Sequence, residues 1–174
     1  MSKGYLCLVL HAHLPYVRHP EHEDFLEEKW LFEAVTETYI PLIQVFDRLL
    51  DESVNYRLTM TLTPSLISML TDSLLQERYV GHLAKLIELA DKEEGRTYGS
   101  PYHEAALMYK KRLREAMSIF CDKYDRNLVK AFKKFQDAGR LEIITCASTH
   151  GYLPLMMICP EAVQAQIKAA TDLY

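Results

Sequence analysis

The sequence predicts an α/β protein in which parallel strands alternate with helices. Three short segments, residues 5–10, 56–62 and 141–146, have the apolar or alternating patterns of strands. Between them, apolar residues recur every three or four positions, which is the helical period. Strands that alternate with helices are typical of βαβ units, whose strands pair in parallel. Three strands alone would leave both sheet edges unpaired, so we expect them to belong to a larger α/β barrel or sheet.

Each predicted strand has its own pattern. Residues 5–10 (YLCLVL) are uniformly apolar, which suits a strand buried on both faces. Residues 56–62 alternate apolar and polar side chains, and residues 141–146 (LEIITC) form a third apolar segment. Thr63 and Pro64 follow the second strand, and this pair predicts an N-cap and the first residue of a helix.

The predicted helices share an apolar stripe with steps of three or four, and they cover residues 31–49, 75–90, 101–135 and 161–174. Pro41 lies inside the first of them, so we expect a kink or a new helical segment there. The charged residues 91–96 predict a surface loop between two helices. Gly139 predicts the end of the longest helix, since glycine adopts the left-handed conformation that terminates many helices.

Composition excludes several classes of protein. The chain has 174 residues, with 20 Lys and Arg against 24 Asp and Glu, and this net charge of −4 gives no reason to expect a nucleic acid partner. No apolar run approaches the ~20 residues of a membrane span, and no signal peptide is apparent. The four cysteines form no C-x-x-C pair, so we expect a reduced, cytoplasmic chain without a membrane partner.

Histidines follow two of the predicted strands. His11 and His13 come directly after the first strand, and an i, i+2 spacing in extended backbone points both side chains the same way. His150 follows the third strand. Because working residues in parallel α/β folds lie where strands end, we expect these three histidines to share a site.

Two chemistries fit such a histidine cluster. It can bind a divalent metal ion, as in metal-dependent hydrolases and deacetylases, or it can hydrogen-bond the hydroxyl groups of a substrate. A metal site would need an additional carboxylate or lysine ligand at a strand end, and none stands after the second or third strand. We therefore expect hydroxyl binding, no metal and no cofactor.

Four segments in the same order resemble glycoside hydrolase family 57, whose members act on α-1,4-glucans. They are residues 11–16 (HAHLPY), 30–42 (WLFEAVTETYIPL), 62–64 (LTP) and 149–154 (THGYLP). Within that family the residues of these segments are most similar to those of the 1,4-α-glucan (glycogen) branching enzymes. α-Amylases and 4-α-glucanotransferases of the family remain alternatives.

The resemblance implies a (β/α)7 barrel with long helical insertions, a retaining mechanism and an amylose- or glycogen-like substrate. His11, His13 and His150 match histidines of the sugar subsite beside the cleaved bond, where they would donate hydrogen bonds to hydroxyl groups. The family's nucleophilic Glu and general-acid Asp would lie beyond Tyr174. Residues 1–174 are therefore expected to be the N-terminal portion of one truncated barrel domain, inactive alone and prone to self-association. A non-catalytic carbohydrate-binding module is a further alternative.

Overall fold

A computed structural model of the chain describes residues 3–174, and it confirms the α/β class with parallel strands. The strands β1 (Val9–Ala12), β2 (Leu58–Leu62) and β3 (Leu141–Ile144) form one sheet in the order β1-β2-β3. Both pairings are parallel, and Met60 of β2 lies opposite Leu10 on one side and Ile143 on the other. The connections between successive strands are helical, as βαβ units require.

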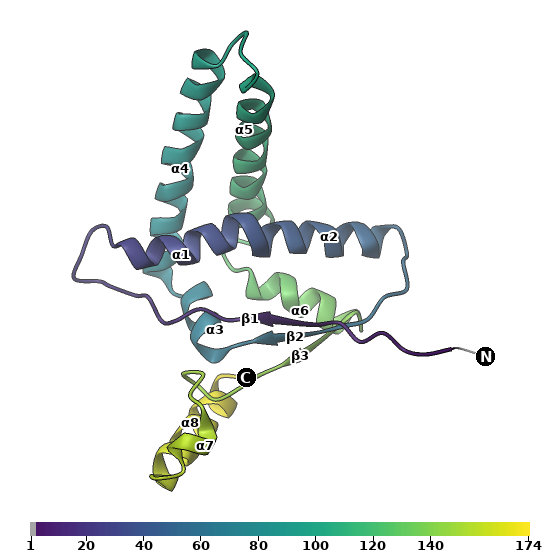
Figure 1. Cartoon of the computed structure of the whole chain (residues 1–174), viewed down its shortest axis with the longest axis vertical. Helices are drawn as coiled ribbons and strands as arrows, with labels where there is room; N and C mark the ends of the chain where they lie inside the picture. The colour runs from purple at the N-terminus through teal and green to yellow at the C-terminus, as the bar shows by residue number, and fades with distance from the viewer. Residues whose placement is uncertain (1–2) are drawn as a thin grey trace.

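The helical segments are α1 (Leu26–Ala34), the π-helix η1 (Val35–Tyr39), α2 (Ile40–Asp51), α3 (Pro64–Leu70), α4 (Ser73–Arg96), α5 (His103–Ser118), the π-helix η2 (Ile119–Lys123), α6 (Val129–Asp137), α7 (Leu153–Met156) and α8 (Pro160–Leu173). Figure 1 shows α1, η1 and α2 as one long rod across the sheet, with α6 beneath it. The hairpin of α4 and α5 projects away from the sheet, and α7 and α8 lie on the sheet's other side. No helix within residues 3–174 is long and apolar enough to cross a membrane.

The core lies between the sheet and the helical rod. Phe46 of α2 packs edge-to-face on Phe135 of α6, with ring centroids 5.3 Å apart, and both side chains are fully buried. Met60 and Leu62 of β2 complete this layer from the sheet side. Burial of large aromatic side chains supplies most of the apolar stabilisation of such a core.

Local signals in the sequence set several helix ends. The Thr63 side chain accepts a hydrogen bond from the Leu66 N–H, as the predicted N-cap of α3 should. Pro41 lies in the first turn of α2, where its missing N–H costs little, and a new segment begins there as predicted. Gly139 has φ +67° and ends α6, which confirms the predicted stop.

The prediction for residues 5–10 is wrong in position and in burial. β1 begins at Val9, because its ladder with β2 pairs Val9 with Thr59 and the positions that follow. Tyr5 is 98% exposed, and Leu6 and Leu8 are also exposed. β1 is an edge strand, and the helical rod covers only one face of the sheet (Figure 1), so an apolar run is not sufficient to bury this segment.

The surface loop predicted at residues 91–96 is instead the last part of α4, which continues to Arg96. Its Lys, Glu and Arg residues are good helix formers, and Asp91 and Glu94 form ion pairs across the hairpin. Lys110 of α5 lies 2.8 Å from a carboxylate oxygen of Asp91 and 2.5 Å from one of Glu94. This pairing with a second helix is a long-range effect that local polarity does not reveal.

The single long helix predicted over residues 101–135 is also wrong, because the chain breaks after η2. Asp125 and Arg126 adopt φ values of +50° and +61°, and α6 begins at Val129. The Val129 N–H donates to Asn127 Oδ1 at 3.0 Å. Two consecutive left-handed residues redirect the chain, so that α6 lies over the sheet while α5 remains in the hairpin (Figure 1).

Candidate functional site: a histidine cluster at the strand ends

The structure brings the three sequence-predicted histidines together. His11 is on β1, His13 follows it, and His150 lies in the loop after β3. The ring centroid of His150 is 4.2 Å from that of His13 and 5.0 Å from that of His11, and the His11–His13 separation is 6.1 Å. They meet because the carboxyl ends of parallel strands share one edge of the sheet.

A line of hydroxyl groups supports the His13 ring. His13 Nδ1 lies 3.1 Å from Thr63 Oγ1, which lies 3.2 Å from Ser65 Oγ, and the Ser65 hydroxyl reaches the Leu14 carbonyl oxygen at 3.3 Å. A carbonyl oxygen only accepts, so all three bonds form at once only when His13 donates from Nδ1–H. This geometry favours the Nδ1–H tautomer, which leaves the Nε2 lone pair of a neutral His13 available as an acceptor.

Burial lowers the pKa of His13 below its ordinary value, and the neighbouring His150 and His11 rings lower it further by charge repulsion. Desolvation disfavours the charged imidazolium, and a second positive charge 4–6 Å away would disfavour it again. His13 is therefore held as a neutral group near pH 7, which suits hydrogen bonding to uncharged hydroxyl groups.

His150 occupies an unusual backbone position. Its φ is +58°, and its N–H donates to the Ala147 carbonyl at 2.8 Å. Gln166 of α8 ties down the preceding residue, since its Oε1 accepts from the Thr149 N–H and its Nε2 donates to Thr149 Oγ1, both at 2.8 Å. His150 Nδ1 also lies 3.2 Å from Cys146 Sγ, and burial raises the pKa of that thiol. The contacts of Thr149 with Gln166 and of His150 with Cys146 thus hold the loop in place.

A hollow of about 470 Å³ opens beside the cluster. Its wall includes His13, the exposed ring of Tyr16, and the hydroxyl groups of Ser65, Ser148 and Thr149. No Asp or Glu of residues 3–174 lines it. The arrangement offers neutral hydrogen-bonding groups and one aromatic face, which suits a polyhydroxyl ligand.

Sequence reasoning identified the histidines but missed the residues that hold them. The sequence predicts Thr63 only as an N-cap, although its single hydroxyl also supports His13. Gln166 and Cys146 carry no local signal, because they meet His150 and its loop only in three dimensions. Within residues 3–174, no group of three or more His, Cys, Asp or Glu side chains is arranged to hold a metal ion.

Comparison with known proteins places this geometry in context. The sequence pattern of the family described as glycosyl hydrolase family 57 matches residues 7–174. The 1,4-alpha-glucan branching enzyme of Thermococcus kodakarensis is 37% identical over 172 residues, which are 99% of this chain and 25% of that enzyme.

Two crystal structures are similar over almost the whole chain. That of the alpha-amylase AmyC from Thermotoga maritima has a TM-score of 0.89 and 49% identity, over 97% of this chain and 32% of the other. That of the branching enzyme from Pyrococcus horikoshii has a TM-score of 0.90 and 34% identity, over 99% and 32%. The chain therefore spans about a quarter to a third of the length of these relatives. The agreement supports the predicted fold class, part of a (β/α)7 barrel.

Proposed function

Because the chain belongs to glycosyl hydrolase family 57, we propose that its histidine cluster forms one wall of an α-1,4-glucan site in a 1,4-α-glucan branching enzyme. The observation that carries this proposal is the convergence of His11, His13 and His150 within 4.2–6.1 Å beside a hollow lined by hydroxyl groups. Amylose or glycogen segments are the proposed substrate, as the names of the relatives suggest.

The proposed role of the histidines is to bind and orient one glucose unit. His13 accepts a hydrogen bond from a substrate hydroxyl group at Nε2, because its Nδ1–H donates to Thr63. His11 and His150 add imidazole groups within 6.1 Å of the His13 ring, and the hydrogen bonds of Thr149 hold the loop that carries His150. Tyr16 offers an apolar ring to a sugar face.

Bond cleavage in a retaining glycosidase needs two carboxyl groups about 5–5.5 Å apart on opposite sides of the glycosidic bond. The hollow beside the histidines has no carboxylate of residues 3–174 in its wall. The chain thus supplies binding and orientation, and the proposed nucleophile and general acid come from outside these residues.

A second candidate is α-amylase activity, and one observation favours it. AmyC from Thermotoga maritima is 49% identical to this chain, whereas the two archaeal branching enzymes are 37% and 34% identical. Both activities use the same glucan donor, and they differ in whether water or a glucan hydroxyl accepts the glycosyl group. The four free cysteines support a reducing compartment, such as the cytoplasm, for either activity.

A hybrid enzyme tests the proposed function directly. This chain replaces the matching segment of the Thermococcus kodakarensis branching enzyme, and activity on amylose is followed by iodine staining and by release of reducing ends. We expect loss of stain without new reducing ends, which is branching. New reducing ends in proportion to the loss of stain would support the α-amylase candidate instead. The 174-residue chain alone, as the control, should give neither signal.

Within the hybrid, His150→Ala should lower kcat by about 2- to 10-fold, because a hydrogen bond to an uncharged sugar hydroxyl is worth roughly 0.5–1.5 kcal/mol. The matched control is His22→Ala, since His22 is exposed and lies outside the cluster. EDTA should leave the activity unchanged. Loss of activity with EDTA and its recovery with Zn²⁺ would contradict the hydroxyl-binding role and favour a metal-dependent hydrolase.

A further inference from the structure

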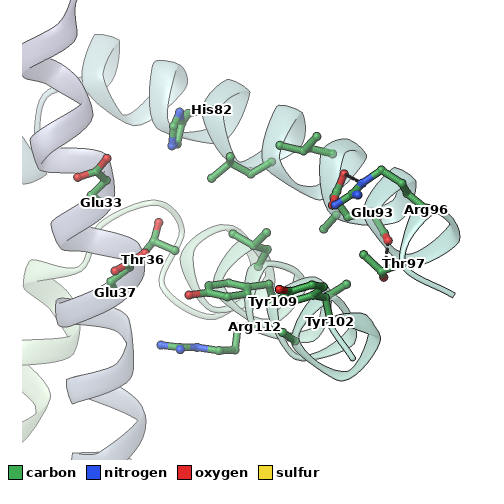
Figure 2. Close-up of a pocket in the computed structure, with 16 residues that line it drawn as sticks. Glu33, Thr36, Glu37, His82, Glu93, Arg96, Thr97, Tyr102, Tyr109 and Arg112 are labelled. Carbon is green, nitrogen blue, oxygen red and sulfur yellow. Dashed lines mark hydrogen bonds and ion pairs between the residues drawn. The ribbon is translucent and has the colours of Figure 1, made fainter. Parts of the chain in front are cut away.

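A second hollow is formed by other helices than those beside the histidine cluster. It measures about 480 Å³ and is enclosed by the α1–η1 part of the rod and by both helices of the α4–α5 hairpin. It shares no residue and no helix with the hollow beside His13. Figure 2 shows side chains entering it from all three of these walls. Nothing in the proposed role of the histidines uses this hollow.

Two tyrosine rings form one wall. Tyr102 and Tyr109 are seven positions apart at the start and in the first half of α5, so they lie on the same side of the helix about two turns apart. Figure 2 shows the two side chains following one another along α5. Tyr102 is 72% exposed and Tyr109 is 51% exposed, which leaves their ring faces accessible to a ligand. Leu86 and Leu89 of α4 form the opposite apolar wall.

Charged side chains surround these rings without being paired to one another. Glu33 and Glu37 enter from the rod, and Arg112 enters from α5. No hydrogen bond or ion pair joins any of these three to another residue that lines the hollow (Figure 2). At the hairpin tip, by contrast, Arg96 Nε donates to Glu93 Oε1 at 2.8 Å. Glu33, Glu37 and Arg112 can therefore hydrogen-bond a ligand that enters the hollow.

The balance of charge and apolar surface narrows the class of ligand. Three carboxylates and two guanidinium groups line the hollow, so a polyanion such as a nucleic acid or a polyphosphate has little electrostatic attraction to it. An apolar helix would bury Glu33, Glu37 and Arg112 without partners, which is costly. A neutral ligand with apolar faces and many hydroxyl groups satisfies both the rings and the charged side chains.

We propose that this hollow is a second α-1,4-glucan site, which holds a short malto-oligosaccharide segment against Tyr102 and Tyr109 while Glu37 and Arg112 hydrogen-bond its hydroxyl groups. The glucan identity of the ligand rests on the proposed function. The site itself stands on a different set of residues, so it would hold the polymer at a distance from the histidines. A glucan long enough to reach both sites binds the second one at a high effective concentration once the first is occupied. Two such sites on one chain therefore favour long glucans over short ones.

The test uses the 174-residue chain with Val9→Lys, a change on the unpaired β1 edge that limits self-association and lies outside both hollows, uniformly labelled for NMR and titrated with maltoheptaose. We expect two separate groups of shifted amide signals, one around Tyr102 and Tyr109 and one around Thr63 and Thr149. In the double variant Tyr102→Ala/Tyr109→Ala the first group should require about fivefold or more maltoheptaose, and the second should be unchanged. Tyr109→Phe keeps the ring and should bind nearly as well as the unmodified chain. Tyr5→Ala is the matched control, because that exposed ring lines neither hollow.

The outcomes separate the two proposals. Absence of shifts around Tyr102 and Tyr109, or shifts that persist unchanged in the double variant, would overturn the second site. Equal binding of cellohexaose, a β-1,4-glucan, would also overturn it, since the proposed ligand is the α-1,4 polymer. Shifts confined to the tyrosine hollow would support the second site and contradict the histidine site. Shifts confined to Thr63 and Thr149 would do the reverse.

Discussion

His13 shows how one hydroxyl group determines the chemistry of a residue. Thr63 accepts the backbone N–H of Leu66, contacts Ser65 and supports the His13 ring, all through Oγ1. Its side chain is completely buried, so this arrangement cannot be exchanged for water without rearrangement. The tautomer of His13, and hence whether it donates or accepts at the hollow, follows from this neighbour.

We expect His13 to titrate below the ordinary histidine pKa of about 6.5 in an NMR pH titration, because burial and the two neighbouring imidazoles disfavour its charged form. The unfolded chain then binds more protons than the folded one, so this contribution to stability is present above pH ~6.5. It is lost as the pH falls from that value through the lower folded pKa. His150→Ala removes one neighbouring charge and should raise the pKa of His13 again. A His13 pKa at or above the ordinary value would contradict the geometry.

Glu28 is the one acidic side chain in the core of the described residues, with an exposure of 1%. Its carboxylate accepts two bonds from Arg78 Nη1, at 2.6 and 2.8 Å, and one from the His19 N–H at 3.0 Å. Arg78 also donates to the carbonyl oxygens of His19 and His22. The pair therefore fastens the loop between β1 and α1 to α4, and this is the same loop that carries Tyr16.

Glu28→Gln should lower the free energy of unfolding by about 3–5 kcal/mol, because it leaves the Arg78 guanidinium, whose side chain is only 16% exposed, without its counter-charge. Glu88→Gln is the control, since Glu88 and Lys92 form a fully solvated pair one turn apart on α4. Urea unfolding followed by circular dichroism measures both variants. A midpoint for Glu28→Gln equal to that of Glu88→Gln would show that the buried pair does not hold this loop.

At the scale of elements, glycine has opposite roles in two helices, since it ends one helix and lies inside the other. Gly139 ends α6 with φ +67°, and Gly81 lies inside α4 with ordinary helical geometry. A Cβ added at either position meets nothing within 4 Å. Only the backbone conformation therefore separates the two sites.

Gly139→Ala should destabilise the fold by about 1–2 kcal/mol, because an alanine in the left-handed region strains the backbone. Gly81→Ala should stabilise it by about 1 kcal/mol, because alanine is the better helix former. Thermal unfolding of both variants gives the comparison, and each serves as the control for the other. Shifts of the same sign in both would contradict the assignment of Gly139 as a conformational stop.

The whole molecule exposes surfaces that a closed barrel would cover. β1 and β3 each pair with β2 alone, so their outer backbone edges are unpaired within residues 3–174. Leu6, Leu8 and Val9 near one edge are exposed, and so are Leu155 and Ile158 beyond the other. Unpaired strand edges with exposed apolar side chains beside them are sites of association between chains.

We therefore expect the 174-residue chain to self-associate. Size-exclusion chromatography with light scattering should give a mass above the 20.2 kDa of one chain, and the mass should rise with concentration. Val9→Lys places a charge on the β1 edge and should reduce this association, whereas the same change at an exposed site of α4, Leu89→Lys, should not. A monomer at all concentrations would refute the expectation.

The sequence by itself determined the features that depend on neighbours along the chain. A strand within residues 56–62, the Thr63–Pro64 helix start and the Gly139 stop are all present in the fold, because caps and turns are local physics. The alternation did not predict burial, since Met60, Thr61 and Leu62 are all buried. The i, i+2 spacing of His11 and His13, with a third histidine after another strand, predicted the cluster, because parallel strands end at one edge of the sheet.

Only the tertiary structure decided the features that depend on distant partners. The ion pair of Lys110 with Asp91 stabilises the last part of α4, whose sequence is typical of a loop. The left-handed turn at Asp125 and Arg126 separates α5 from α6. The hydroxyl support of His13 joins residues 50 positions apart, and the tyrosine hollow needs four helical elements, α1, η1, α4 and α5. These features share one physical reason. A contact between segments far apart in sequence forms only when the core brings them together, and the periodicity within one segment does not predict it.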